Sequence, residues 1–81
     1  MTDYQEYLDF IYATLETVNK NKVELTENTA LVADMGLSSL EVMESIEQIE
    51  DHFDIDIPIN LLSDVTCPGD LAKLVRQQLE G

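Results

Sequence analysis

Apolar positions that recur at steps of three and four predict a first amphipathic helix near the start of the chain. It is expected to run from about residue 3 to about residue 18, and the polar residues 19–22 end it. Thr2 and Gln5 have the spacing of a capping box at its start. The apolar positions of this helix, expected to face the core, are Tyr4, Tyr7, Leu8, Ile11, Leu15 and Val18.

A second helix is predicted from Ser39 to about Phe53, with one apolar stripe and otherwise acidic faces. The inward stripe is expected to comprise Leu40, Met43, Ile46, Ile49 or Glu50, and Phe53, with Met43 mostly buried. The other faces carry Glu41, Glu44, Glu47, Gln48 and Asp51. Like charges three or four positions apart cost an isolated helix about 0.2 to 0.5 kcal/mol each, and this helix has no Lys or Arg to offset them. The acidic face indicates either a docking surface for basic proteins or a merely solvated face.

The segments on either side of the second helix lack helical periodicity. Residues 19–37 form a long connection with apolar pegs and, we expect, a short helical turn near residues 29–33. The alternation in residues 53–59 is typical of a strand, but Pro58 removes a donor and no second strand-like run exists to pair with it. We therefore expect an extended loop with Ile57 and Ile59 turned inward, followed by a short third helix from Ile59 to Ser63.

A last helix follows, with Thr66 as its cap and Pro68 at its second position. Its core face is expected to comprise Leu71, Leu74, Val75 and Leu79. The predicted fold is therefore all-α: a small bundle of three main helices plus one short helix, with a long loop between the first two. A chain of 81 residues suits a single domain, residues 1–81.

The charge of the chain narrows its range of partners. It has 17 acidic and 4 basic residues, a formal net charge of −13 at pH 7, which argues against nucleic-acid phosphates and anionic membranes. Basic protein patches are the expected partners, and long-range attraction raises the rate of encounter with them. No apolar run approaches the roughly 18 residues of a membrane span. The first six residues do not have the pattern of a secretory signal, so the cytoplasm is the expected compartment.

Few residues suggest chemistry performed by the chain itself. Cys67 is the single cysteine, expected to be half-buried, and no Cys/His cluster has zinc spacing. The only histidine, His52, lies thirteen residues after Ser39 on the same predicted helix, roughly 20 Å away, which excludes a Ser-His nucleophilic pair within the chain. Carboxylate pairs such as Asp54 with Asp56 could hold a divalent cation weakly, but the EF-hand spacing is absent.

The most informative segment is residues 34–41, Asp-Met-Gly-Leu-Ser-Ser-Leu-Glu. Ser38 followed three residues later by Glu41 is a capping box, which predicts that the second helix begins here. Gly36 gives the preceding turn its flexibility. Ser39 then occupies the first helical position, where uncapped N–H groups and the helix dipole favour an anion fixed nearby. A phosphodiester on Ser39 would be stabilised there.

This segment resembles the acyl carrier protein family, which carries phosphopantetheine on the serine of a D-S-L element that follows Asp-x-Gly-x. Here Ser39 corresponds to that serine, and Ser38 stands where the family most often has aspartate. Both residue types cap helices well, so the helix start is compatible with either. The resemblance extends from about Leu31 onward and continues in Glu44, Ile46, Ile49, Glu50, Phe53 and Ile57-Pro58.

The resemblance implies a discrete carrier that is not an enzyme. A phosphopantetheinyl transferase would move 4′-phosphopantetheine from coenzyme A onto Ser39, and acyl intermediates of fatty acid or polyketide-type biosynthesis would be held as thioesters on the arm. Acyl-loading, condensing and tailoring enzymes with basic patches would be partners, and a monomer is expected. The residues expected to bind partners are Leu37, Leu40, Glu41, Met43, Glu44 and Glu47.

Two alternatives remain open from the sequence. One is an aminoacyl or peptidyl carrier served by an adenylating enzyme, since Ser38 replaces the usual aspartate. The other is an acidic helical interaction module that never receives the prosthetic group. The strong acidity of the chain favours the acyl or polyketide type over the peptidyl type.

Overall fold

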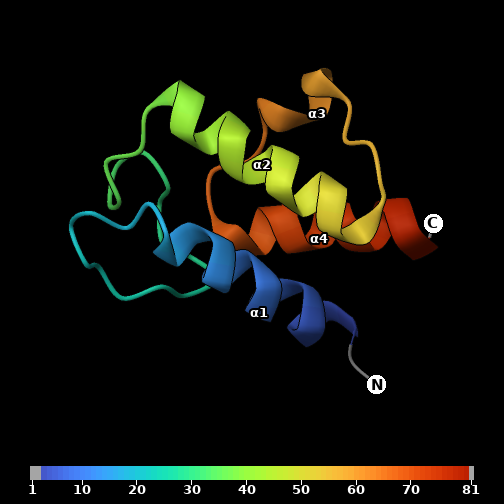
Figure 1. The fold of residues 1–81 in the computed structure, drawn as a ribbon, viewed down its shortest axis with the longest axis horizontal. Coiled ribbons are helices and arrows are strands. Elements are labelled where there is room, and N and C mark those ends of the chain that lie inside the picture. Colours follow the sequence, from blue (N-terminus) through green and yellow to red (C-terminus); the bar gives the residue numbers. More distant parts are fainter. Residues whose placement is uncertain (1–2, 81) are drawn as a thin grey trace.

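The computed structural model describes residues 3–80, apart from the side chain of Asp3, and this part of the chain is all-helical. It contains α1 (Asp3–Glu16), α2 (Ser39–Phe53), α3 (Ile59–Leu62) and α4 (Pro68–Glu80), shown in Figure 1. The prediction of three main helices, one short helix and a long first loop is confirmed. The capping box expected from Thr2 and Gln5 lies outside the described residues.

The three main helices pack around one shared core, and α1 contacts both of the others. Helix α1 packs most extensively against α4 and also contacts α2. It runs against the direction of both partners, while the short α3 lies beside the middle of α2 (Figure 1). Helix α1 begins and α4 ends at one end of the bundle, and α2 begins at the opposite end. The bundle measures 33 × 27 × 19 Å.

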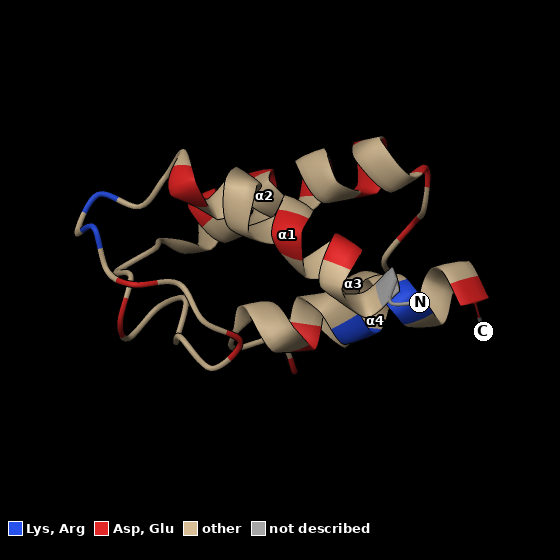
Figure 2. Cartoon of the chain, turned by 90° about the horizontal axis from the view of Figure 1, so that it is seen from below, with Lys and Arg blue, Asp and Glu red and all other residues tan. Residues whose placement is uncertain are grey.

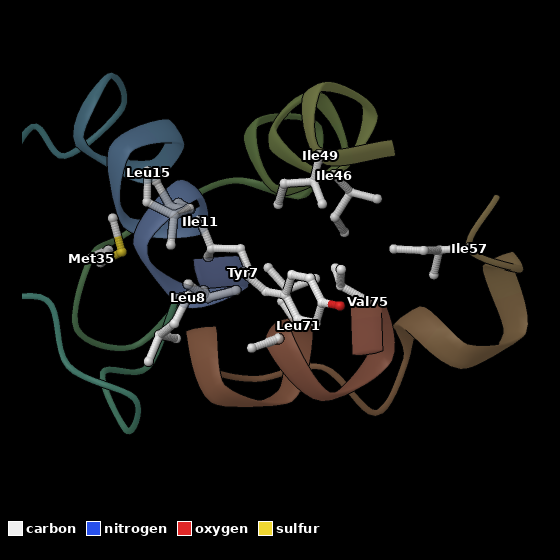
Figure 3. Close-up of a cluster of buried hydrophobic side chains, with 13 residues drawn as sticks. Tyr7, Leu8, Ile11, Leu15, Met35, Ile46, Ile49, Ile57, Leu71 and Val75 are labelled. Carbon is white, nitrogen blue, oxygen red and sulfur yellow. The ribbon is translucent and has the colours of Figure 1, made fainter. Parts of the chain in front are cut away.

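A single apolar core holds the helices together. Side chains of α1, α2 and α4 converge between the helices, with Met35 from the long loop beneath Leu15 and Ile57 at the other end (Figure 3). Fully burying one such aliphatic side chain stabilises a fold by about 1.5 to 3 kcal/mol. The core comprises Tyr7, Leu8, Ile11, Leu15, Leu31, Met35, Leu37, Ile46, Ile49, Ile57, Leu71, Ala72 and Val75.

Helix α1 ends within two residues of the predicted position. Beyond Glu16 the backbone tightens, with N–H groups of Thr17 and Val18 donating to carbonyls three residues back, at 3.2 and 3.0 Å. Such a tightened last turn is common at helix ends. The predicted stripe on α1 is confirmed at its centre, while Tyr4 and Val18 at its two ends are only partly buried.

The inward stripe of α2 differs from the prediction in its first half. Leu40 and Met43 are 66% and 46% exposed, so the expectation that they face the core was wrong. Helix α2 instead buries Ser45, Ile46 and Ile49. The Ser45 hydroxyl donates to the Glu41 carbonyl at 3.0 Å, which satisfies a polar group that would otherwise be costly to bury.

The extended loop after α2 is confirmed, and one carboxylate holds it. Asp54 ends α2 in the left-handed region, with φ 55°, and the Ile57 N–H donates to Glu50 Oε2 at 2.7 Å. Ile57 is buried as expected, but Ile59 is 76% exposed, so its predicted inward orientation was wrong. Ile59 opens α3, and that short helix ends at Leu62, one residue before the predicted end.

The start of α4 is capped in a different way from the predicted one. Pro68 is the first helical residue rather than the second, and the Cys67 carbonyl accepts from the N–H groups of Asp70 and Leu71. Thr66 does not accept from the helix; its N–H and hydroxyl both donate to the Asp70 carboxylate at 3.1 Å. Leu79 was also expected in the core, but it is exposed because it lies in the last turn of α4, beyond the buried residues of that helix.

The long loop between α1 and α2 contains the expected turn, slightly later than predicted. Residues 31–35 form it, and both the Asp34 and Met35 N–H groups donate to the Ala30 carbonyl at 3.0 Å. This turn is joined to the segment that precedes α4, because the Leu31 N–H donates to the Thr66 carbonyl at 2.9 Å. None of the described helices has the length and apolar character needed to cross a membrane.

Candidate functional site

The chain enters α2 through an alternation of buried and exposed residues. Met35 and Leu37 are buried in the core, whereas Gly36, Ser38 and Ser39 lie on the surface. Gly36 has φ +73°, a left-handed conformation that costs residues with a Cβ about 1 to 2 kcal/mol. The sequence predicted a flexible turn at Gly36, and the structure shows that the residue adopts a conformation that favours glycine. Two buried anchors and one tight turn therefore fix where Ser38 and Ser39 emerge.

The capping box at the start of α2 is confirmed in both of its hydrogen bonds. Ser38 has extended backbone, its Oγ accepts from the Glu41 N–H at 3.2 Å, and its own N–H donates to Glu41 Oε1 at 2.9 Å. Ser39 is the first helical residue and its side chain is exposed. The two adjacent serines thus differ in role: the Ser38 hydroxyl serves the helix, and the Ser39 hydroxyl faces solvent.

Glu41 is engaged through both carboxylate oxygens. Besides accepting from the Ser38 N–H through Oε1, it forms an ion pair through Oε2 with Lys20 Nζ at 2.8 Å. The Lys20 ammonium, followed by the backbone N–H of Ser38, lowers the pKa of Glu41. In return the Glu41 carboxylate raises the pKa of Lys20. This carboxylate is therefore occupied within the chain, unlike the other acidic residues expected to face partners.

An apolar groove opens beside Ser39. Its volume is about 530 Å³, and it lies between the first half of α2, the turn around Leu31, and α3. Ser39 and Met43 stand at its α2 side, and Ile59 stands at its α3 side. The side chains lining it belong to Ala30, Leu31, Val32, Ala33, Ser39, Val42, Met43, Ile46, Ile59, Leu62, Ser63, Val65 and Thr66. The groove explains why Met43 and Ile59 are not covered: they face this hollow rather than the core.

The residues expected to bind partners divide into two groups. Leu40 and Met43, with Glu44 and Glu47, are exposed on α2 after Ser39. Leu37, by contrast, is only 4% exposed and belongs to the core. Among the described residues, Glu41 is the one acidic side chain of α2 that forms an ion pair. The exposed group is therefore a mixed apolar and acidic surface next to the Ser39 hydroxyl.

Lys20, paired with Glu41, is the one Lys or Arg side chain that the described part of the chain places against this surface. Figure 2 shows Lys and Arg in two places, the loop between α1 and α2 and the helix α4, while Asp and Glu spread over α1, α2 and the loops. Helix α2 itself carries no Lys or Arg. A basic partner approaching α2 would therefore meet an almost uniformly negative field.

The remaining candidate residues do not assemble a catalytic site. His52 lies near the end of α2, about 20 Å from Ser39 by helix rise, and its ring stacks on Phe10 with centroids 3.8 Å apart. Cys67 is half-buried, as expected. In the described part of the chain no three His, Cys, Asp or Glu side chains are grouped so that they could hold a metal ion.

Two contacts of the site were missed from the sequence. These are the Lys20–Glu41 ion pair and a hydrogen bond from Asn21 Nδ2 to the Met35 carbonyl at 3.1 Å. Both join residues that are far apart in the chain, so no local periodicity reveals them. The groove was missed for the same reason, since three separate segments form it.

Comparison with known proteins agrees with this geometry. Residues 9–75 match the family model described as "Phosphopantetheine attachment site". The chain is similar to the acyl carrier protein of Exiguobacterium sibiricum, with 32% identity over 79 residues that cover 98% of this chain and all of the relative. It is also similar to the acyl carrier protein of another Exiguobacterium strain, at 33% identity over the same coverage.

A solved structure shows the same likeness in three dimensions. It is that of a candidate acyl carrier protein from Mycobacterium tuberculosis, with a TM-score of 0.79 and 30% sequence identity. The match covers 88% of this chain and 96% of the other.

Proposed function

The chain belongs to the acyl carrier protein family, and from that premise we propose that it is a discrete carrier whose attachment residue is Ser39. Proteins of this family are carriers rather than enzymes, and their prosthetic group is covalently attached 4′-phosphopantetheine. When bound, the arm supplies a terminal thiol that holds acyl groups as thioesters. The observation that carries the proposal is the exposed Ser39 hydroxyl at the capped start of α2, beside an apolar groove.

The residues around Ser39 fit such a group. The Ser38 hydroxyl is already used by the capping box, so only the Ser39 hydroxyl points freely to solvent. The N–H groups of the first turn that precede Glu41 have no acceptor within the helix, and the positive end of the helix dipole stabilises a phosphodiester there. These donors come from the backbone, so no basic side chain is needed to supply them.

Attachment requires a transferase and coenzyme A. The Ser39 oxygen forms the new P–O bond to the phosphopantetheine phosphorus, and the pyrophosphate linkage of coenzyme A breaks. Adenosine 3′,5′-bisphosphate leaves with the bonding electrons, and the serine proton passes to a base of the transferase. This chain contributes the exposed nucleophile and its fixed orientation.

We assign partner docking to the exposed surface of α2 next to Ser39. Leu40 and Met43 offer apolar contact, and Glu44 with Glu47 attracts basic side chains. Leu37 supports this surface from the core, and Glu41 supports it as part of the cap. The expected partners are a phosphopantetheinyl transferase and the acyl-loading, condensing and tailoring enzymes of fatty acid or polyketide-type biosynthesis. The protein is expected to act as a monomeric single domain in the cytoplasm.

The apolar groove favours acyl cargo over aminoacyl cargo. Most of its lining side chains are apolar, and it starts at the attachment residue. Transfer of an alkyl chain from water into the groove is favourable, whereas transfer of the charged amine of an aminoacyl group is not. Loading the carrier from a panel of acyl and aminoacyl donors separates the two types. Preference for aminoacyl donors would reject the fatty acid or polyketide assignment but retain the carrier.

Intact mass tests the attachment residue. Incubation with coenzyme A and a promiscuous transferase should add about 340 Da, the mass of the transferred group. Ser39→Ala should abolish this gain while the helical circular dichroism signal stays unchanged. Ser38→Ala should keep the gain, although loss of the cap costs about 1 kcal/mol of stability. A mass gain that survives in Ser39→Ala, or that never appears in the wild type, would refute the proposal.

A further inference from the structure

The Asn19 side chain closes the turn formed by residues 19–23 through two hydrogen bonds. Asn19 Nδ2 donates to the Val23 carbonyl at 2.9 Å, and Asn19 Oδ1 accepts from the Val23 N–H at 3.1 Å. The Lys22 N–H donates to the Asn19 carbonyl at 3.2 Å, and Lys22 has φ 53°. The asparagine thus bonds both backbone groups of the residue four positions on, so the shape of the turn is locally determined.

This turn contacts the chain on both sides of Ser38 and Ser39. Asn21 Nδ2 donates to the Met35 carbonyl at 3.1 Å, one residue before the Gly36 turn. A Cβ on Gly36 would lie 3.1 Å from the same amide nitrogen, so the Asn21 side chain packs closely against the Gly36 backbone. Lys20 Nζ lies 2.8 Å from Glu41 Oε2, on the other side of the serines. The turn therefore holds the attachment segment both before and after Ser38 and Ser39.

Lys20 is linked to the helix cap through Glu41. Glu41 gives one carboxylate oxygen to the Ser38 N–H and the other to Lys20, so the ammonium restrains the carboxylate that restrains the helix start. The Glu41 side chain is only 19% exposed. The Lys20 ammonium is also the first cause that lowers the pKa of Glu41.

We propose that the turn of residues 19–23 is a positioning element for phosphopantetheine attachment, in which Lys20 and Asn21 hold the backbone around Ser39 in the conformation that the transferase uses. This inference rests on the proposed function, because it assumes that Ser39 is the acceptor. Neither side chain touches the reacting oxygen. They act through Glu41 and through the Met35 carbonyl, so both are positioning residues.

Charge alone predicts the opposite effect, which makes the proposal testable. Removing a lysine makes the carrier more negative, so a basic transferase should load it at the same rate or faster. Loss of positioning should slow loading instead, because a reacting group misplaced by about 1 Å can cost about 100-fold in rate. Lys22 offers a matched control: it lies in the same turn and is exposed, and no contact of its ammonium is observed in the described part of the chain.

The experiment compares kcat/KM for loading by one transferase across single variants of the full chain. Lys20→Gln should lower kcat/KM about tenfold, a part of the roughly 100-fold cost of a 1 Å misplacement, whereas Lys22→Gln should equal or exceed the wild type. Lys20→Arg should restore most of the rate, since the guanidinium can also pair with Glu41. Asn21→Ala should slow loading as Lys20→Gln does. Equal rates for Lys20→Gln and Lys22→Gln would overturn the positioning role.

A second readout does not depend on loading. Amide hydrogen exchange of Ser38, followed by NMR, should accelerate in Lys20→Gln and remain unchanged in Lys22→Gln, because only Lys20 restrains the acceptor of that N–H. The pKa of Glu41 should also rise in Lys20→Gln. Unchanged exchange and pKa would contradict the proposal even where loading slows.

A double variant checks the route of the coupling. Glu41→Gln retains an acceptor for the capping box but cannot form the ion pair. In that background Lys20→Gln should produce no further loss of kcat/KM, since the two residues act through one contact. Additive losses would show that Lys20 acts elsewhere and would overturn the inference. Failure of the wild type to gain the arm would instead refute the proposed function, and is recognised by the absence of any mass gain.

Discussion

At the scale of single residues, the site depends on a contrast between two adjacent serines. Ser38 has extended backbone and its hydroxyl is consumed by the capping box, whereas Ser39 is helical and exposed. Two serines therefore have different roles at adjacent positions, because the backbone changes from extended at Ser38 to helical at Ser39. Serine in place of aspartate at position 38 keeps the cap, because both side chains offer an oxygen acceptor.

Gly36→Ala should destabilise the protein. Its φ of +73° is unfavourable for alanine, and the new Cβ would lie 3.1 Å from Asn21 Nδ2. We expect a loss of about 1 to 2 kcal/mol in the free energy of unfolding, measured by urea denaturation. Gly36→Asn should lose less, since asparagine tolerates the left-handed region better. Stability equal to the wild type in Gly36→Ala would show that the turn can change its conformation.

Tyr4 should titrate well above an ordinary tyrosine. Its hydroxyl donates to the Glu27 carboxylate, and this hydrogen bond is the largest cause that raises the pKa of Tyr4 to about 12. A raised pKa stabilises the fold fully below the ordinary value near 10, and this contribution is lost as pH rises from there through the folded value. NMR titration of the Tyr4 ring checks the value. In Glu27→Gln the pKa should fall toward 10; an unchanged value would assign the shift to burial instead.

At the scale of elements, helix α2 changes character along its length. Its first turn binds and presents Ser39, its middle contributes Ile46 and Ile49 to the core, and its end is fixed by the left-handed Asp54. Exposed apolar side chains concentrate in the first half, where α2 borders the groove rather than α1. One helix thus contributes both to the core and to the proposed docking surface.

The start of α4 offers a test of capping. The Asp70 carboxylate accepts from the N–H and hydroxyl of Thr66, and the backbone bond is the first cause that lowers the pKa of Asp70. Asp70→Ala should therefore cost about 1 kcal/mol at pH 7. A lowered pKa means that this stability is present above the ordinary value near 4 and is lost as pH falls through the folded value.

Urea denaturation of wild type and Asp70→Ala at pH 7 and in acid measures this loss. The difference between the two proteins should shrink in acid, where the wild-type carboxylate is protonated. Asp70→Asn, which keeps one acceptor oxygen, should lie between them. A difference that persists unchanged in acid would show that packing, not the ionised carboxylate, carries the effect.

Periodicity was sufficient to predict the helices, and the capping box to predict where α2 begins, but neither predicted the surroundings of the candidate attachment segment. The ends of α1 and α2 fall within two residues of prediction, since local apolar spacing and the Ser38–Glu41 box determine them. The burial of Met43 was predicted wrongly because periodicity does not show which face of α2 packs against the other helices. The buried face of α2 includes Ser45, a polar residue that apolar periodicity does not assign to the core. Its hydrogen bond to the Glu41 carbonyl is apparent only in the structure. Lys20 escaped prediction because its partner is 21 positions away.

At the scale of the whole molecule, charge opposes folding. With 17 acidic and 4 basic residues, and two ion pairs found in the described part of the chain, most carboxylates repel one another without compensation. The modest core must therefore stabilise the fold against this repulsion, and the balance should respond to ionic strength.

Added salt should raise the melting temperature at neutral pH. An increase from about 0.01 M to about 0.15 M shortens the Debye length from about 30 Å to about 8 Å, so repulsion across the bundle is largely screened. Millimolar divalent cation should act in the same direction. Thermal unfolding followed by circular dichroism measures both effects. A melting temperature that does not respond would indicate that the carboxylates are already well separated.

The placement of the helix ends has a practical consequence. Because α1 starts and α4 finishes at the end of the bundle remote from the beginning of α2, an affinity tag, fluorophore or fused domain joined there leaves the region of Ser39 unobstructed (Figure 1). Immobilised through either terminus, the protein would orient Ser39 away from the support. The molecule can therefore be anchored on a sensor chip or linked to another polypeptide without shielding the end of the bundle that carries the proposed attachment residue.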